Sequence, residues 1–147
     1  MKFPLGTVIS GTLVREALIQ AFTYELHRLD PLNEVVTRAN DLITAWSEDS
    51  WCDFDESADT LDALIDELNA LCPPFVYFGA HPGDGADFGF WVDILSLDEA
   101  IQEAKHDIPQ IQDNFLYLPD DKLWVSVNDH GNTTLLSDDA GNPGTEI

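Results

Sequence analysis

The stretch FVYFGAHPGDGADFGFWV, residues 75–92, divides the chain into two parts with different periodicity. Its two ends, residues 75–78 and 88–92, are short aromatic and β-branched runs that are typical of strands. The segment between them, residues 81–87, is rich in Gly, Pro and Asp and predicts a turn. We therefore expect strands from this point on, and a different kind of structure before it.

The residues before this stretch predict three helices, because apolar side chains recur there at helical spacing. The first helix runs from about residue 12 to residue 29. The second follows Asp30 and Pro31, which we expect to be its N-cap and its first helical residue. The third follows residues 55–57 and ends at Cys72, which two prolines follow.

The residues after the stretch predict one short helix and several strands. Ser96 and Glu99 have the spacing of a capping box, which would begin the helix. Strands are expected over residues 115–118, 123–127 and 133–136, with a hairpin loop over residues 128–132. The predicted fold class is α+β, with the helical half packed on a small, mostly antiparallel sheet. We expect a single domain over residues 1–136 and a flexible polar tail over residues 137–147.

Acidity is the most unusual property of the composition. The chain has 147 residues, with 28 Asp and Glu against 6 Lys and Arg, and its net charge is −22. Phosphate contacts require Lys and Arg, so the chain is not expected to bind nucleic acid directly. An anionic membrane is disfavoured for the same reason. No export signal or membrane-spanning run is evident, so we expect a cytoplasmic protein in which Cys52 and Cys72 are reduced thiols.

The third helix carries a regular row of aspartates. Asp55, Asp59, Asp62 and Asp66 are spaced i, i+4, i+7 and i+11, which places them on one helix face, opposite the apolar positions. Solvated helices usually place Lys among such acids, whereas like charges at this spacing repel by a few tenths of a kcal/mol per pair. The pattern favours a surface that attracts a cationic macromolecule.

The predicted partner-binding set extends this row into the acidic segment before it. Trp51 and Phe54 could serve there as apolar anchors, although filling the core between the helices is the alternative for both rings and for Trp46. The full set is Asp49, Trp51, Asp53, Phe54, Asp55, Glu56, Asp59, Asp62, Asp66 and Glu67.

Two stretches of the chain are VYFGAHPGDGADFGFW at residues 76–91 and VNDHGN at residues 127–132. They resemble stretches of a group of small, acidic, uncharacterised bacterial and phage proteins. The resemblance covers about a third of the chain. It implies a phage or a mobile element as the source, and it carries no catalytic residue over to this chain.

These observations predict an acidic inhibitor without a cofactor or a catalytic residue. It would mimic nucleic acid and occupy the basic groove of a nucleic-acid-binding host defence protein, as anti-restriction and anti-CRISPR proteins do. One alternative is an immunity protein that blocks a basic nuclease site, and another is a protein adapted to high salt. A third is a small metal-dependent enzyme, for which the weak candidate ligands are His81, Asp84, Asp87, Asp129 and His130.

Overall fold

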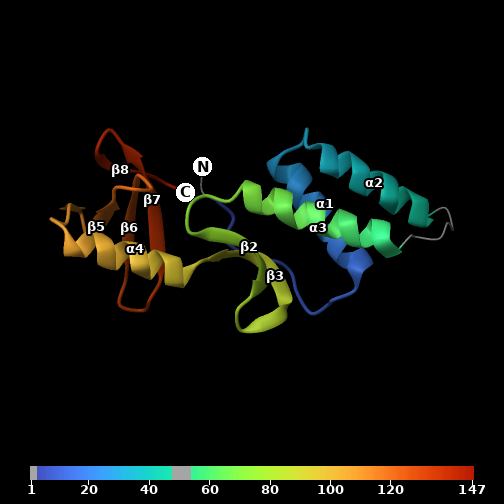
Figure 1. The fold of residues 1–147 in the computed structure, drawn as a ribbon, viewed down its shortest axis with the longest axis horizontal. Helices are drawn as coiled ribbons and strands as arrows, with labels where there is room; N and C mark the ends of the chain where they lie inside the picture. The colour runs from blue at the N-terminus through green and yellow to red at the C-terminus, as the bar shows by residue number, and fades with distance from the viewer. Residues whose placement is uncertain (1–2, 48–53) are drawn as a thin grey trace. The chain divides into compact units, whose positions relative to one another are not determined.

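A computed structural model gives the structure of the protein and describes residues 3–47 and 54–147 (Figure 1). These residues form four helices and two antiparallel sheets, which confirms the predicted α+β class. We expected one domain over residues 1–136, but the contacts within the chain group it into two compact units. We call Leu5–Cys72 with Tyr77–Trp91 the helical unit, and Met1–Pro4 with Pro73–Val76 and Val92–Ile147 the sheet unit.

The helical unit contains the three predicted helices, α1 (Arg15–Leu29), α2 (Glu34–Ser47) and α3 (Phe54–Ala70), which contact one another pairwise. Each helix buries an apolar face, as its sequence periodicity predicts. In α1 the charged residue Glu25 is also buried, and it forms an ion pair with Arg28. Pairing makes the burial of this carboxylate tolerable, because an unpaired buried charge is strongly destabilising.

Helix α2 begins three residues later than we predicted. Asp30 and Pro31 are not its N-cap and first residue, since the chain turns at Pro31 and the helix starts at Glu34. Asn33 takes the capping role, because its side-chain oxygen accepts a hydrogen bond from the backbone N–H of Val35 at 3.0 Å. Asp30 instead accepts a hydrogen bond from the Asn33 side chain.

Helices α1 and α3 of this unit contact a three-stranded sheet with the order β1-β3-β2. Phe22 of α1 contacts the sheet directly, with its ring 4.8 Å from that of Phe78 and 5.5 Å from that of Phe88. The turn between β2 and β3 is shorter than predicted, because both strands extend to residues 81 and 84. The strands are β1 (Gly6–Ile9), β2 (Val76–His81) and β3 (Asp84–Val92).

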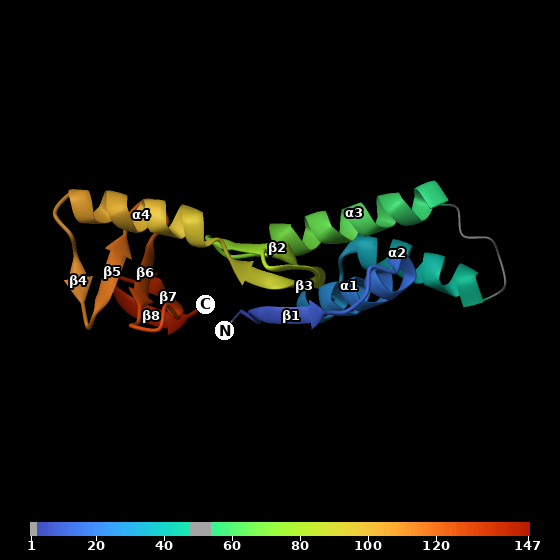
Figure 2. The ribbon, with the colours of Figure 1, turned by 90° about the horizontal axis from the view of Figure 1, so that it is seen from below.

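The sheet unit consists of one helix against a five-stranded antiparallel sheet whose strands follow in chain order (Figure 2). Leu97 and Ile101 of the helix pack against Leu116, Leu118, Val125 and Leu135 of the sheet. The elements are α4 (Ile94–His106), β4 (Ile111–Gln112), β5 (Phe115–Leu118), β6 (Leu123–Val127), β7 (Thr133–Asp139) and β8 (Asn142–Glu146).

Helix α4 also begins at a different residue from the predicted one. Its N-cap is Asp93, not Ser96, and the Asp93 carboxylate accepts hydrogen bonds from both the backbone N–H and the hydroxyl of Ser96. These hydrogen bonds lower the pKa of Asp93, because they favour its charged form. The Ser96–Glu99 pair lies inside the helix and does not form a capping box at its start.

One side-chain hydrogen bond links the two edge strands of the five-stranded sheet. Gln112 of β4 donates a side-chain hydrogen bond to Asn142 of β8, although these strands lie at opposite ends of the strand order. Trp124 is fully buried, and its indole N–H donates to the Asp138 carboxylate at 3.0 Å. Its neighbour Tyr117 has a raised pKa, mainly because it is desolvated and also because it lies beside Asp138.

The prediction of a flexible tail over residues 137–147 is wrong. These residues complete β7 and form β8, and the backbone N–H of Ile147 donates to the carbonyl of Leu135. The reversal is a two-residue hairpin turn in which both Ala140 and Gly141 have positive φ, at 51° and 87°. Such turns match the twist of the strands that they join. We predicted a flexible tail because the segment is polar, and its composition did not indicate a hairpin turn.

Candidate functional site: an acidic row on helix α3

Helix α3 has two chemically different faces. One face carries buried residues that recur at intervals of three and four positions, namely Ser57, Thr60, Leu64 and Leu68. This face contacts α1 and α2 in the core of the helical unit. The opposite face carries Asp55, Asp59, Asp62 and Asp66, and each of these residues is exposed. We call these four residues the α3 row, and the structure brings them together as their spacing predicted.

The dimensions of the α3 row follow from helix geometry. Eleven residues separate Asp55 from Asp66, so the row extends over roughly 16 Å at about 1.5 Å per residue. Side chains three or four residues apart on a helix stand about 5–6 Å from one another. The row is therefore a line of four carboxylates, each close enough to repel its neighbour.

A positive charge lies near the amino-terminal end of the row. Arg15 of α1 donates a hydrogen bond to the Ser57 hydroxyl at 3.1 Å, which places its guanidinium near the first turn of α3. Within residues 3–47 and 54–147, Asp59, Asp62 and Asp66 have neither an ion-pair nor a hydrogen-bond partner for their carboxylates. The carboxyl-terminal three quarters of the row thus presents its charge to solvent without neutralisation.

Glu67 was predicted to bind the partner, but its side chain contacts Asn33 within the helical unit. Its side chain is partly buried and accepts a hydrogen bond from the Asn33 side chain at 2.9 Å. Asn33 also caps α2, so Glu67 connects α3 to the start of α2. Glu56 is exposed, and its helix position lies about a quarter turn away from the α3 row. The α3 row and Glu56 are therefore the accessible acids of the predicted set on α3.

Several predicted partner-binding residues cannot be placed. Asp49, Trp51 and Asp53 lie outside the described residues. Phe54 is the first residue of α3, and its side chain lies outside the described part. Trp46, for which we considered both a core and a surface role, is partly buried near the end of α2.

The candidate metal ligands lie in two different units, and the side chains of His81 and Asp84 make local contacts in the β2–β3 hairpin. His81 accepts a hydrogen bond from the Gly83 N–H at the hairpin turn and packs edge-on against Trp91. Asp84 accepts from the Ala86 N–H in the same hairpin. In the sheet unit, Asp129 and His130 lie in a loop that is organised by hydrogen bonds to the Asn128 side chain.

Among the described residues, no group of three or more His, Cys, Asp or Glu side chains is placed to hold a metal ion. Asp87, which lies on β3 three residues after its start, therefore belongs to no such group either. The Cys72 thiol is half-buried, and its desolvation raises its pKa to about 11. It is therefore protonated near neutral pH, when it can donate to the carbonyl of Leu68.

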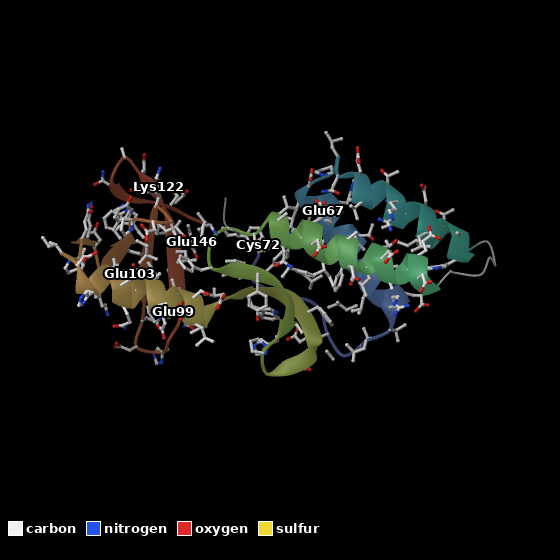
Figure 3. All side chains as sticks on the ribbon, viewed as in Figure 1. Glu67, Cys72, Glu99, Glu103, Lys122 and Glu146 are labelled. Carbon is white, nitrogen blue, oxygen red and sulfur yellow. The ribbon has the colours of Figure 1, made fainter. Side chains whose placement is uncertain are left out.

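Acidic residues are abundant in both units. The α3 row is therefore a regularly spaced subset of acids that occur throughout the chain. The helical unit has 16 Asp and Glu against 3 Arg, a net charge of −13. The sheet unit has 12 Asp and Glu against 3 Lys, a net charge of −9. Figure 3 shows members of this second group, with Glu99 and Glu103 on α4 and Glu146 on β8.

The structure also brings together four acids that we did not predict as a set, Glu103, Asp107, Asp120 and Asp121. They come from the end of α4 and from the turn between β5 and β6, and no sequence pattern links these two segments. The pair Asp120 and Asp121 is visible in the sequence, but we interpreted it only as a turn.

No protein-family model, no curated protein and no solved structure matches this chain. Within the residues that the structure describes, none of the helices has both the length and the apolar character required to cross a bilayer.

Proposed function

We propose that this protein is an acidic inhibitor that mimics nucleic acid and occupies the basic DNA- or RNA-binding groove of a host defence protein. Restriction and CRISPR components are the partners of this type. The observation that supports the proposal best is the α3 row, in which three exposed aspartates form no ion pair with any residue that the structure describes. The proposal assigns the protein no catalytic residue and no cofactor.

The charge density of the α3 row is of the order found in nucleic acid, although it is lower. Each strand of duplex DNA carries one phosphate per about 3.4 Å of helix axis. The row carries one carboxylate per about 5.5 Å of its own axis, from a rise of about 1.5 Å per residue. The row alone would therefore imitate a short length of one strand. Glu56 adds a further exposed charge beside it.

A basic groove would recognise such a surface in two ways. At long range, opposite charge speeds association, and this effect weakens as salt shortens the Debye length to about 8 Å at physiological ionic strength. At contact, Lys and Arg side chains of the groove would pair with Asp59, Asp62 and Asp66. A rigid helix holds these carboxylates at fixed spacing, so little ordering is required when they bind.

Charge reversal on α3 tests the proposal. The variant D59K/D62K/D66K changes the charge by +6 on exposed positions, so we expect helical content to be retained. A cationic partner captured from host lysate by the unmodified protein, after nuclease treatment, should no longer be captured by the variant. The control D98K/E99K/D129K makes the same change in charge at exposed positions of the sheet unit, and it should retain the partner.

The control separates recognition of a face from general attraction to a negative protein. Equal loss of the partner with both variants would mean that net charge alone causes capture, and it would contradict the proposed α3 interface. If a single nuclease is captured and its activity is blocked, the protein is an immunity protein that uses the same face.

Adaptation to high salt is a second candidate, and one observation favours it. The two units have similar acidity, at −13 and −9, so carboxylates are not confined to one interface. A high net charge of one sign keeps a protein soluble in concentrated salt, whatever its activity. The dependence of thermal stability on salt distinguishes this candidate from the first.

A further inference from the structure

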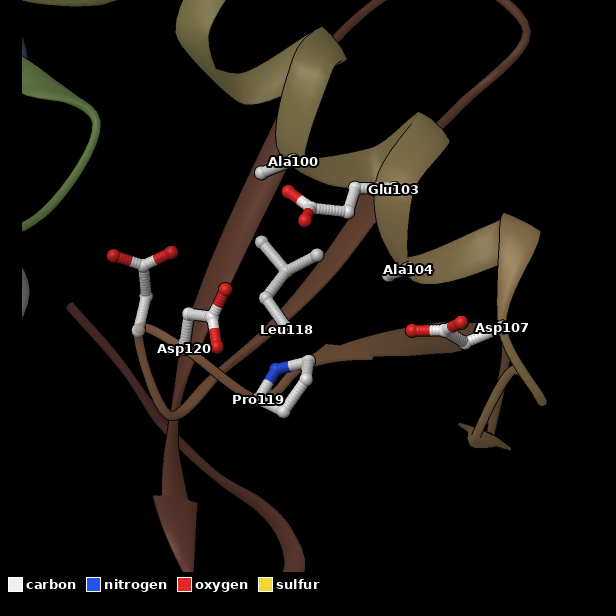
Figure 4. Close-up of a pocket in the computed structure, with 8 residues that line it drawn as sticks. Ala100, Glu103, Ala104, Asp107, Leu118, Pro119 and Asp120 are labelled. Atoms are coloured by element: carbon white, nitrogen blue, oxygen red, sulfur yellow. The ribbon is translucent and has the colours of Figure 1, made fainter.

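A small pocket opens in the sheet unit between the second half of α4 and the turn after β5 (Figure 4). Its volume is about 170 Å³. For comparison, an apolar cavity of about 150 Å³ is large enough to hold benzene. Its lining residues are Ala100, Glu103, Ala104, Asp107, Leu118, Pro119, Asp120 and Asp121.

The floor of the pocket is apolar. Ala100 and Ala104 lie one helical turn apart on α4, and their short side chains leave space above the sheet. Leu118 lies beneath them with only 2% of its surface exposed, and Pro119 continues the apolar surface at the start of the turn. The floor can therefore bury a hydrocarbon chain, but it offers no side-chain hydrogen-bond donor.

Carboxylates surround this floor. Figure 4 shows Glu103 of α4 and Asp120 of the turn on opposite sides of Leu118. Within residues 3–47 and 54–147, the carboxylates of Glu103, Asp107, Asp120 and Asp121 form no hydrogen bond or ion pair. The nearby lysines of this unit, Lys105 and Lys122, are not among the residues that line the pocket. The charge at the rim is therefore open to a cation from outside the chain.

The form of the pocket selects among cations. A divalent metal ion needs several oxygen ligands that converge at about 2.0–2.6 Å. The described residues contain no group of three such ligands placed to hold a metal. A bare ion would also leave the apolar floor without a contact. A primary ammonium on an aliphatic chain fits both parts, because the chain covers the floor while the ammonium reaches the rim.

We infer that this pocket accepts a lysine side chain presented by a partner protein. The four methylene groups lie over Ala100, Ala104 and Leu118, and the ammonium lies between Glu103 and Asp120. Lysine fits better than arginine, because the ammonium is a compact charge on a flexible stem whereas the guanidinium is a wide planar fork. This inference does not depend on the function proposed above, since it concerns the sheet unit and is tested without any partner protein.

The test uses a small analogue of lysine as the probe. N-acetyl-lysine N-methylamide is titrated into the labelled protein, and backbone amide chemical shifts are followed by NMR. We expect saturable shifts confined to residues 100–107 and 118–121, with a dissociation constant on the order of millimolar. The norleucine analogue, which lacks the ammonium, and methylammonium, which lacks the chain, should each bind at least about fivefold more weakly.

Variants then separate the pocket from the general charge of the unit. The variant E103Q/D120N should weaken binding of the lysine analogue at least about fivefold. The control D98N/E99Q removes the same charge from exposed positions of α4 that do not line the pocket, and it should bind within about twofold of the unmodified protein.

Any one of five results would overturn the inference. The first four are the absence of saturable shifts, equal binding of the norleucine analogue, equal weakening by both variants, and tighter binding of the arginine analogue than of lysine. Displacement of the lysine analogue by equimolar Mg²⁺ would also overturn it, since the pocket would then be a metal site.

Discussion

Asp66 and Glu67 are consecutive acids of α3, yet their surroundings differ. Asp66 is exposed and belongs to the α3 row, whereas Glu67 accepts a hydrogen bond from Asn33 on the neighbouring element. Helical periodicity alone predicted the exposure of Asp66 correctly. It could not predict the contact of Glu67, because Asn33 lies 34 residues away and the contact depends on how α2 and α3 pack.

This difference predicts opposite outcomes for two matched substitutions. Glu67→Ala should lower the free energy of unfolding by about 1 kcal/mol, because Asn33 loses a charged acceptor. Asp66→Ala should change it by no more than about 0.5 kcal/mol, and in the stabilising direction, because repulsion within the α3 row is reduced. Urea denaturation measures both values. Equal destabilisation by the two changes would contradict the separate roles assigned here.

The helices were predictable as elements because burial on one face leaves a regular signal in the sequence. Their first residues were less predictable, since Asp30 and Ser96 have capping chemistry but Asn33 and Asp93 form the N-caps of α2 and α4. Which of several suitable residues caps a helix is decided by the preceding loop. The short strands β1, β4 and β8 were missed for a related reason, because pairing with neighbours defines them and their own composition does not.

At the pairing of β1 with β3, the structure requires a glycine that no sequence pattern identified as special. A Cβ on Gly89 would lie 2.0 Å from the carbonyl oxygen of Gly6. Gly89→Ala should therefore lower the free energy of unfolding by at least about 2 kcal/mol, through displacement of β1. Gly85 is the matched control on the same strand, since nothing lies within 4 Å of its Cβ position.

Chemical denaturation with circular dichroism compares these two variants. Gly85→Ala should remain within about 0.5 kcal/mol of the unmodified protein. A Gly89→Ala variant that is as stable as Gly85→Ala would show that β1 does not approach β3 as closely as described.

For the whole molecule, composition gives the net negative charge but does not predict where the acids gather, and the cationic partner stays a prediction. The α3 row could be predicted because helix geometry fixes the relation of Asp59 to Asp62 and Asp66. The pocket between Glu103 and Asp120 could not, because it forms only where α4 ends above the turn after β5. Long-range packing creates such a site, and no local rule describes it.

The two functional candidates differ in how salt should affect thermal stability. For a nucleic-acid mimic with charge −22, salt should raise the Tm mainly below about 0.3 M NaCl, because the Debye length is already only about 8 Å at 0.15 M. Further salt should then have little effect. Scanning calorimetry from low to molar NaCl tests this expectation. A Tm that continues to rise steeply up to molar salt would instead favour adaptation to high salt.

The most direct test of nucleic-acid mimicry is a competition titration. Labelled duplex DNA or RNA is bound to the captured cationic partner, and fluorescence anisotropy follows its displacement by the unmodified protein and by D59K/D62K/D66K. We expect stoichiometric displacement by the unmodified protein and at least about 100-fold weaker displacement by the variant, equivalent to about 2.7 kcal/mol. Equal displacement by both proteins, or displacement by neither, would contradict the account.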